Sequence, residues 1–327
     1  MVLIVSETHD ITTDRVIEWL FKFGYSNILR VNDGTPIYVR HISLGCSRNE
    51  IILDVNNITF SVEDVEFFWY RRGLFRFDIK AKLDFVLQKD NFGKAQNFHK
   101  NEWIPVRNYI IRKLEQKAFL GDFNRIFTNK ILNLETAQKC GLRIPKTHIS
   151  NYSRVIRENI DNEKDYICKP VSETLHIEDD ECEYSTYTKK IFKEDIRDEI
   201  RYCTPQFIQE CIEKWIELRV FIIKRKLFAM AIFSQREEIT SVDFRNGGFE
   251  TRPRVTPITL PIEIEDRLLQ FMDISGYSTG SLDLILTQEG DYIFLEVNPI
   301  GVIDMVSTPC NYMIEKEIAT YIMNTMN

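Results

Sequence analysis

Short apolar runs and apolar positions at helical spacing divide the first third of the chain into predicted strands and helices. Val2 to Ser6 is a brief apolar run, which is typical of a buried strand. Apolar residues then recur at helical spacing until Gly24, which favours a helix that stops at this glycine. The predicted strands span 2–6, 51–55 and 67–70, and the predicted helices span 14–23, 80–87 and 107–119. Residues 1–120 therefore predict an α/β domain.

The remainder of the chain predicts two further domains of α+β type, 121–205 and 206–327. The first contains a helix at 130–140 and a short strand at 166–170. Its acidic segment 172–190 predicts a loop or a hairpin. The second is rich in strands, predicted at 207–212, 218–223, 227–233, 281–286 and 293–299, with helices at 264–275 and 311–324.

Length and charge narrow the class of protein. A chain of 327 residues with 44% hydrophobic residues can bury a full core in about two or three domains. It contains no apolar run of the ~18 residues that a membrane helix needs, and its first residues lack the features of a signal peptide, so we expect a cytoplasmic protein. The net charge of −7 argues against nucleic-acid binding. A local basic pair, Arg71-Arg72, fits a small anion or an acidic peptide.

Cysteine and histidine do not predict a metal site or a disulfide framework. The seven Cys residues are scattered, none of them in a Cys-x-x-Cys pair, and the five His residues lie far apart. Reduced thiols are therefore expected.

Three oxygen-bearing side chains stand on the last two predicted strands. Asp283 lies in the first strand, and Glu296 and Asn298 are two residues apart in the second, so these two point to one face. A buried face does not carry such groups for packing, because their desolvation has to be compensated by cations. Oxygen ligands without His or Cys suit Mg²⁺ in a nucleotide site. The alternative is a polar strand end with solvated acids.

Basic side chains occur where burial without an anion would be costly. Lys169 lies in a predicted strand directly before a proline, and Lys130 opens a predicted helix. Arg219 shares one face of a strand with Glu217, and an arginine fixed there can make bidentate contacts to phosphate. The alternatives are lysines that reach solvent and a cross-strand ion pair for Arg219.

Taken in order along the chain, these residues resemble the ATP-grasp superfamily. The order is Lys, Lys-Pro, Gln-Glu, Glu-Leu-Arg, Asp and Glu-x-Asn-Pro, and the resemblance covers about residues 122–325. It implies an N-terminal pre-ATP-grasp α/β domain followed by a two-subdomain ATP-grasp fold that holds ATP. The implied roles are phosphate binding by Lys130 and Lys169, the adenine hinge at Gln209, Glu210, Cys211 and Ile212, ribose binding by Glu217, and Mg²⁺ binding by Asp283, Glu296 and Asn298. Arg219, argued above from its place on the strand, would help to balance the triphosphate and is a candidate catalytic residue.

A narrower resemblance is to the graspetide ligases of the microviridin and grasp-with-spasm types. The segments that carry it are 68–72, Asn129-Lys130, 166–170, Ser234-Gln235, 242–245 and Asn298-Pro299-Ile300-Gly301. It implies an ATP-dependent macrocyclase that joins Asp or Glu side chains of a ribosomal precursor peptide, made of leader and core, to Ser, Thr or Lys side chains. One departure is the segment 172–176, which lacks the glycine that many ATP-grasp enzymes have in the loop over the phosphates.

Two further residues are candidates for the second chemical step. Arg245, beside Gly247-Gly248, could stabilise the negative charge of a tetrahedral intermediate, and Asp243 could act as the base for the attacking hydroxyl. The alternatives are a solvated Arg245 and an Asp243 that only pairs with it.

Two rival functions stay open at this point. One is another ATP-grasp carboxylate–amine ligase, such as an enzyme that adds glutamate to a protein. The other is a non-enzymatic module that changes shape on binding ATP. The oligomeric state is also open, with a homodimer as one option.

Overall fold

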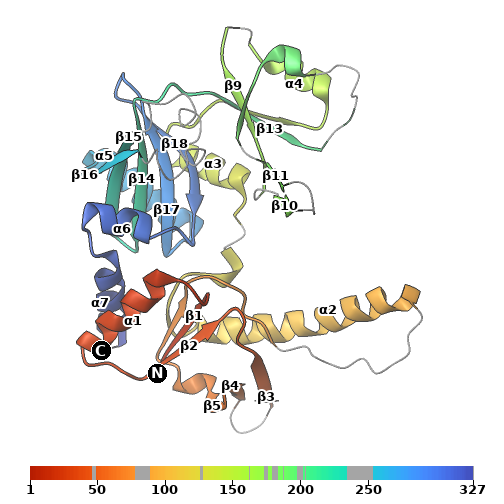
Figure 1. Ribbon diagram of the computed structural model, residues 1–327, viewed down its shortest axis with the longest axis vertical. Helices are drawn as coiled ribbons and strands as arrows, with labels where there is room; N and C mark the ends of the chain where they lie inside the picture. The colour runs from red at the N-terminus through yellow and green to blue at the C-terminus, as the bar shows by residue number, and fades with distance from the viewer. Residues whose placement is uncertain are drawn as a thin grey trace. The chain divides into compact units, whose positions relative to one another are not determined.

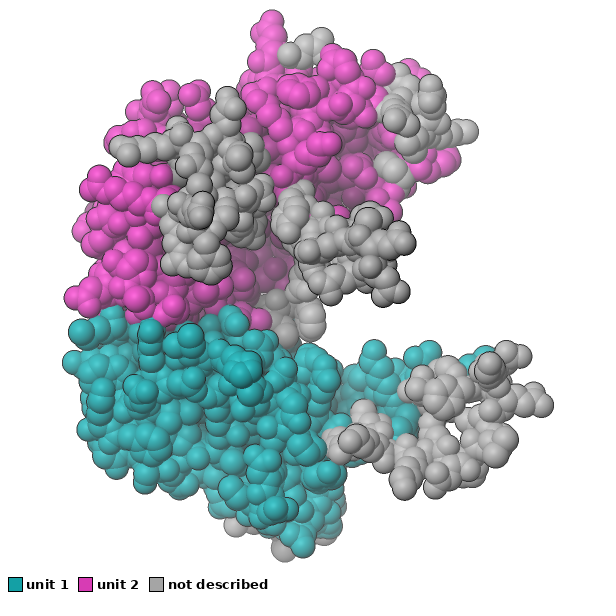
Figure 2. All heavy atoms as spheres, in the orientation of Figure 1, with its two compact units in different colours: residues 1–124, 313–327 teal, residues 125–312 magenta. Residues whose placement is uncertain are grey.

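The computed structural model divides the chain into two compact units, coloured separately in Figure 2: residues 1–124 with 313–327, and residues 125–312. We describe each unit by itself. The structure describes residues 1–326 except for 46–48, 78–88, 126–127, 162, 173–175, 179–182, 187, 197–201, 203 and 234–252. Within this described part, no helix has the length and apolar character required to cross a membrane.

A parallel sheet forms the centre of unit 1. Its strands, in spatial order, are β2 (Ile28–Asn32), β1 (Val2–Ser6), β6 (Phe67–Tyr70) and β7 (Ala118–Leu120). All residues of β1 and β6 are buried, as expected for central strands of a parallel sheet. Helix α1 (Ile11–Lys22) packs against α7 (Ile314–Met326), and the α7 residue Tyr321 meets the ring of Phe67 edge-on at 6.0 Å.

Unit 1 also contains a long helix and a second sheet (Figure 1). The helix is α2 (Lys89–Leu114). The sheet is antiparallel and consists of β3 (Ile37–Ser43), β4 (Glu50–Val55) and β5 (Ile58–Ser61). The turn between β4 and β5 consists of Asn56 and Asn57, both with positive φ, the conformation that a type I′ hairpin needs and that asparagine tolerates.

Unit 2 contains two antiparallel sheets and a hairpin. The smaller sheet orders β12 (Lys189–Ile191), β9 (Tyr166–Lys169), β13 (Gln206–Glu210) and β8 (Thr147–Ser150), with α4 (Ser153–Asn159) packed on it. The larger sheet orders β16 (Arg254–Ile258), β15 (Lys226–Phe233), β14 (Ile216–Ile223), β17 (Thr279–Leu286) and β18 (Tyr292–Asn298). The hairpin pairs β10 (His176–Glu178) with β11 (Glu183–Ser185).

The core of unit 2 lies on one face of the five-stranded sheet. Alternate apolar residues of β14, such as Leu218 and Val220, join Leu282 of β17 in this cluster. Helices α3 (Lys130–Lys139) and α5 (Ile262–Ser275) cover the same face, and a short helix α6 (Asp304–Cys310) contacts β15 and β16. Because side chains alternate along a strand, Arg219 and Asp283 project from the opposite face.

Several predicted elements differ from the structure. The helix predicted at 107–119 ends at Leu114, and 118–120 form β7, because that apolar segment pairs in parallel with β6. Strands β2, β3, β5, β8 and β16 and helices α4 and α6 were not predicted. The acidic segment 172–190 contains the β10–β11 hairpin, one of its two predicted forms. The helix predicted at 80–87 lies outside the described residues.

The predicted domain boundaries differ from the two units at the C-terminus. We assigned residues 206–327 to one subdomain, but α7 clusters with unit 1 instead. The reason is its apolar face: Ile314, Ile318, Ala319 and Ile322 are buried against unit 1, chiefly against α1.

Candidate active site

A row of charged side chains crosses three neighbouring strands of the five-stranded sheet. Backbone pairing places Arg219 of β14 opposite Asp283 of β17, and Asp283 opposite Glu296 of β18. These three side chains therefore lie side by side on the face away from the core cluster. Their partial burial is costly without partners, so the ion pairs that they form are expected to hold the row in place.

Arg219 and Asp283 form the central ion pair of this row. The Arg219 Nε and Nη2 atoms lie 3.0 Å and 3.3 Å from the two carboxylate oxygens of Asp283, and the side chains are only 11% and 18% exposed. Arg219 Nη1 also lies 3.0 Å from the Met305 sulfur. The cross-strand ion pair considered for Arg219 is thus present, and the pair holds the guanidinium in a fixed position.

Glu296 meets Lys130 at the start of α3. The Lys130 Nζ lies 3.8 Å from a carboxylate oxygen of Glu296 and donates a hydrogen bond of 3.2 Å to the Pro170 carbonyl oxygen. Asn129 caps the helix, because its side-chain oxygen accepts hydrogen bonds from the first helical N–H groups. Lys130 thus connects the charged row to Pro170, which directly follows Lys169 at the end of β9.

Asn298 has a local partner at the end of β18. Its Oδ1 accepts hydrogen bonds of 3.1 Å from the backbone N–H groups of Ile300 and Gly301, closing the turn of the Asn-Pro-x-Gly segment. Gly301 has φ +60°, and a Cβ there would lie 2.6 Å from the Ser281 oxygen, so the turn requires glycine. Asn298 therefore shapes this turn, and its role as a metal ligand stays a prediction.

The donor set of the charged row fits a hard divalent cation. Asp283 and Glu296 stand opposite each other on neighbouring strands, and both offer only oxygen. Within the described ranges, no group of three or more His, Cys, Asp or Glu side chains could hold a metal ion. Two carboxylates are the protein contribution expected where Mg²⁺ also takes oxygens from phosphates and water. The residues present therefore fit magnesium together with a nucleotide better than a metal held by protein alone.

Lys169 lies at the end of β9, as the sequence predicted. Its Nζ is 5.4 Å from the centre of the Phe207 ring, and Phe207 is its partner across the β9–β13 pair. An aromatic face stabilises an ammonium group. Lys169 is half-buried, so its charge is held close to the sheet.

In the predicted adenine hinge, two of the backbone N–H groups already donate hydrogen bonds to other backbone carbonyls. Glu210 N–H donates to the Lys146 carbonyl at 2.9 Å, and Cys211 N–H donates to the Asp165 carbonyl at 2.8 Å. Across the described residues, no acceptor pairs with the Ile212 N–H. Of these three hinge amides, that of Ile212 is therefore the one available to an adenine edge.

Side chains near the hinge are also fixed by neighbours. Gln209 is fully buried and donates a hydrogen bond of 2.9 Å to the Thr147 hydroxyl, so its carboxamide ties β13 to β8. Glu210 pairs with Lys164 at 2.6 Å on the surface. Burial raises the pKa of the Cys211 thiol, which keeps it protonated near neutral pH.

Glu217 and Lys214 form an ion pair that the sequence did not predict. The Lys214 Nζ lies 2.9 Å from a Glu217 carboxylate oxygen, and the two side chains are 8% and 12% exposed. The sequence predicted Glu217 as a ribose contact but did not point to Lys214. A lysine three residues before an acid that starts a buried strand was the available signal.

Two predicted catalytic residues, Asp243 and Arg245, lie outside the described residues. So do Ser234-Gln235 of the graspetide-like segments and residues 173–175 of the segment 172–176. Their roles stay predictions from the sequence.

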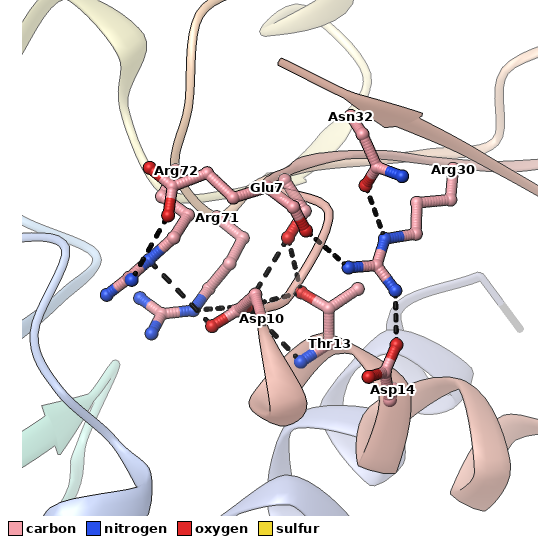
Figure 3. A network of polar contacts seen from close by, with 9 residues as sticks. Glu7, Asp10, Thr13, Asp14, Arg30, Asn32, Arg71 and Arg72 are labelled. Carbon is pink, nitrogen blue, oxygen red and sulfur yellow. Dashed lines mark hydrogen bonds and ion pairs between the residues drawn. The ribbon is translucent and has the colours of Figure 1, made fainter. Parts of the chain in front are cut away.

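The basic pair Arg71-Arg72 forms part of a polar network in unit 1 (Figure 3). Arg71 is buried, and its Nε lies 3.2 Å from Asp10, the capping residue of α1. Arg72 lies 3.4 Å from Glu7. Arg71 is therefore a structural cation at the carboxyl ends of β1 and β6, and the anion site considered from the sequence is occupied by the protein's own carboxylates.

Burial and neighbouring charges shift the pKa values of Arg71 and Asp10 in opposite directions. Burial lowers the pKa of Arg71 to about 10, although Asp10 opposes the change. Burial alone would raise the pKa of Asp10, but Arg71, Thr13 and Arg72 together outweigh it and hold the pKa below its usual range. Both groups therefore stay charged at neutral pH.

Comparison with solved structures identifies the fold of this chain. No protein-family model and no curated protein matches the sequence. Among solved structures, a RiPP-associated ATP-grasp ligase from Chryseobacterium gregarium, in complex with ADP and a leader and core peptide, matches with a TM-score of 0.80. It is 25% identical to this chain and covers 99% of it and 96% of its own length.

The chain has the fold of the ATP-grasp peptide ligases. The macrocyclase MdnC of Microcystis aeruginosa, bound with precursor peptide MdnA, matches at TM-score 0.79 and 26% identity over 99% of this chain and all of its own. The ATP-grasp ligase PsnB, complexed with a phosphomimetic precursor variant, Mg and ADP, has the same fold, with TM-score 0.72 and 16% identity over 100% and 98% of the two chains. The predicted resemblance to ATP-grasp graspetide maturases and the predicted fold class are confirmed.

Proposed function

We propose that this chain is an ATP-dependent peptide macrocyclase that joins Asp or Glu side chains of a ribosomal precursor peptide to Ser, Thr or Lys side chains. The observation that carries the proposal is the charged row of Arg219, Asp283 and Glu296, with Lys130 paired to Glu296, in the fold of ligases that bind ADP and precursor peptides. The enzyme class predicted from the sequence, an ATP-grasp ligase, agrees with these neighbours. We place it in the cytoplasm, where ATP and ribosomal products are available.

The reaction has two steps. A side-chain carboxylate of the peptide attacks the γ-phosphorus of ATP, the bond from that phosphorus to the bridging oxygen breaks, and ADP leaves. A hydroxyl or amine then attacks the acyl carbon of the acyl phosphate, loses its proton to a base, and expels phosphate. One water is removed from the peptide for each bond formed, and ATP becomes ADP and phosphate.

The protein's part in the first step is to neutralise and position the phosphates. Lys130, Lys169 and Arg219 are the cations proposed to bind them, and Asp283 and Glu296, with Asn298, are the residues proposed to hold Mg²⁺. When bound, Mg²⁺ would shield the phosphate charge. Because Arg219 and Lys130 are already held by these acids, they would meet the nucleotide with little further ordering.

The nucleotide base and the second step use other residues. We propose that the Ile212 N–H contacts adenine and that Glu217 contacts the ribose, with Lys214 holding the Glu217 carboxylate in place. Arg245 is proposed to stabilise the tetrahedral intermediate and Asp243 to accept the proton of the attacking group, as the sequence suggests.

The direct test is a reaction with the precursor peptide. A small gene beside this one, encoding repeats rich in Thr or Ser and in Asp or Glu, would supply it. Incubation with ATP and Mg²⁺ should release ADP and remove one water per bond, as measured by mass spectrometry, and fragmentation distinguishes ester from amide. ADP release that needs free glutamate instead would favour a glutamate-adding ligase, and ATP binding without turnover would favour a non-enzymatic module. A homodimer is tested by the mass of the chain in solution.

Replacement of Lys169 by alanine should weaken nucleotide binding about tenfold, since a hydrogen bond to a charged group is worth about 1.5–3 kcal/mol. The fold should be retained because the side chain is half-buried on an aromatic ring and not in the core. Calorimetry with ADP and Mg²⁺ measures the affinity. Lys189→Ala, an exposed lysine on the neighbouring strand β12, is the matched control and should bind normally. Unchanged affinity in Lys169→Ala would refute the phosphate role.

A further inference from the structure

We propose that a groove beside helix α2 in unit 1 binds an acidic segment of the precursor peptide that also carries bulky apolar side chains. The proposal rests on the proposed function for the identity of the peptide. The groove, called here the α2 groove, is formed by residues 33–36, residues 74–77 and one face of α2. It encloses about 800 Å³, within the range of ligand sites.

Helical spacing builds one wall of the α2 groove. Lys100, Trp103, Ile104 and Arg107 are three or four residues apart along α2 and therefore share a face. Opposite them, the segment that follows β6 supplies aromatic rings. The Phe77 ring stacks on Trp103 with a centroid distance of 5.6 Å and an angle of 7°. The groove thus has an aromatic surface that can bury apolar side chains.

The charges that line the α2 groove are mainly positive. It contains Arg76, Lys100 and Arg107 against a single carboxylate, that of Asp33. None of the three cations forms an ion pair with a carboxylate elsewhere in the described ranges of the chain. This differs from the nearby Arg71, which is neutralised by Asp10. An occupant with carboxylates would supply the missing negative charge.

Arg107 is the cation that shows the lack of a partner most clearly. Its guanidinium lies over the Phe123 ring at 5.1 Å, so its stem is packed and its direction is fixed. Its Nε is buried, and no acceptor within the described residues receives a hydrogen bond from it. A buried donor without an acceptor is unfavourable, which a carboxylate or carbonyl of a ligand would correct.

A peptide fits these features better than a nucleic acid. The chain has a net charge of −7, which opposes a long polyanion, whereas a short peptide can place acids against the cations and apolar side chains against Trp103. The α2 groove also belongs to unit 1, while the charged row belongs to unit 2. Binding one part of a precursor here would raise the effective concentration of its reactive part at the catalytic residues.

The test uses the full chain without ATP and three fluorescein-labelled peptides. The first repeats the unit Glu-Phe-Asp-Leu, the second replaces its acids with Lys, and the third replaces its apolar residues with Ser. Fluorescence anisotropy should show binding of the first peptide only. The emission of Trp103 should change on binding, and this change should be absent in Trp103→Phe. Equal binding of the acidic and lysine peptides would overturn the proposal.

Two groove variants and one control variant localise the binding. Lys100→Gln and Arg107→Gln should each lower the affinity for the acidic peptide by about tenfold or more, the cost of a lost charged hydrogen bond. Lys100 is exposed, so its replacement should not disturb folding. Arg112→Gln makes the same change on another face of α2, where the side chain is exposed and outside the groove, and should bind normally. Equal loss in Arg112→Gln, or displacement of the peptide by ADP, would refute the groove as a peptide site.

The experiments distinguish failure of the groove proposal from failure of the macrocyclase assignment. If the groove variants lose peptide affinity while the wild-type chain forms no bond in any precursor, the macrocyclase assignment fails and the groove stands. If the wild type forms bonds and the groove variants show an unchanged KM for the precursor, the groove proposal fails and the macrocyclase assignment stands.

Discussion

Glu296→Gln should lower bond formation in the precursor peptide by about 10²-fold or more, which is the typical cost of losing one electrostatic contact to a transition state. The substitution keeps the size of the side chain but removes one of the two facing carboxylates on β17 and β18. Fewer negative charges would hold Mg²⁺ less tightly, and Lys130 would lose the acid that positions it. The defect should therefore be partly relieved by raising the Mg²⁺ concentration.

A matched control separates this effect from a general change in charge. Asp291 lies directly before β18, has a side chain that is 40% exposed, and pairs with Arg143. Asp291→Asn removes the same charge near the same strand and should leave activity within about twofold, as expected for a surface pair. Mass spectrometry of the peptide and ADP release measure both variants. Normal turnover in Glu296→Gln at low Mg²⁺ would exclude the metal role.

Asp10→Ala should destabilise unit 1 by about 3–5 kcal/mol, because it leaves the Arg71 guanidinium buried without its partner. The same change removes the cap of α1, where the Asp10 carboxylate accepts hydrogen bonds from the Thr13 N–H at 3.3 Å and hydroxyl at 2.6 Å. Asp14→Asn is the control: Asp14 pairs with Arg30 at an exposed position, and its loss should cost about 1 kcal/mol or less. Urea unfolding followed by tryptophan emission reports mainly on unit 1, which contains three of the four tryptophans, Trp19, Trp69 and Trp103.

The pH dependence of this pair has a definite sign. The pKa of Asp10 is lower in the folded state than its ordinary value of 3.8, so its contribution is complete above that value. It is lost as the pH falls below 3.8 through the folded pKa. Asp10→Asn keeps an oxygen for the cap but cannot titrate. The stability difference between wild type and Asp10→Asn should therefore be constant from pH 7 to about pH 5 and shrink below pH 4. A constant difference down to pH 2 would contradict this assignment.

For the charged row, the pattern of apolar and polar residues predicted the face of each side chain but not the pairing between strands. Alternation along each strand separated Arg219 from the buried Leu218, and Asp283 from Leu282, so the face of each side chain was readable from the sequence. The register between strands was not readable, because it depends on which residues pair across 64 positions of chain. Only the fold showed that Arg219 and Asp283 are direct neighbours and that each satisfies the other.

Other features depended on contacts between distant segments. Lys214 was missed because a lysine side chain is normally solvated, and its burial follows from the fold around β14. The α2 groove brings residues 33–36, 74–77 and 100–107 together, and no local pattern links these three segments. Helix α7 was predicted as a helix, but its packing on α1 was decided by long-range apolar contacts.

The sequence by itself determined the α/β and α+β fold class, the ordered set of charged residues and, through the resemblance that this order carries, the ATP-grasp architecture. These are properties of spacing and residue type, which are local along the chain. The tertiary structure alone decided which charges neutralise each other: Arg71 with Asp10, Arg219 with Asp283, and Lys130 with Glu296. Desolvation makes such pairing necessary, but partners come from segments far apart in sequence, so only the folded chain identifies them.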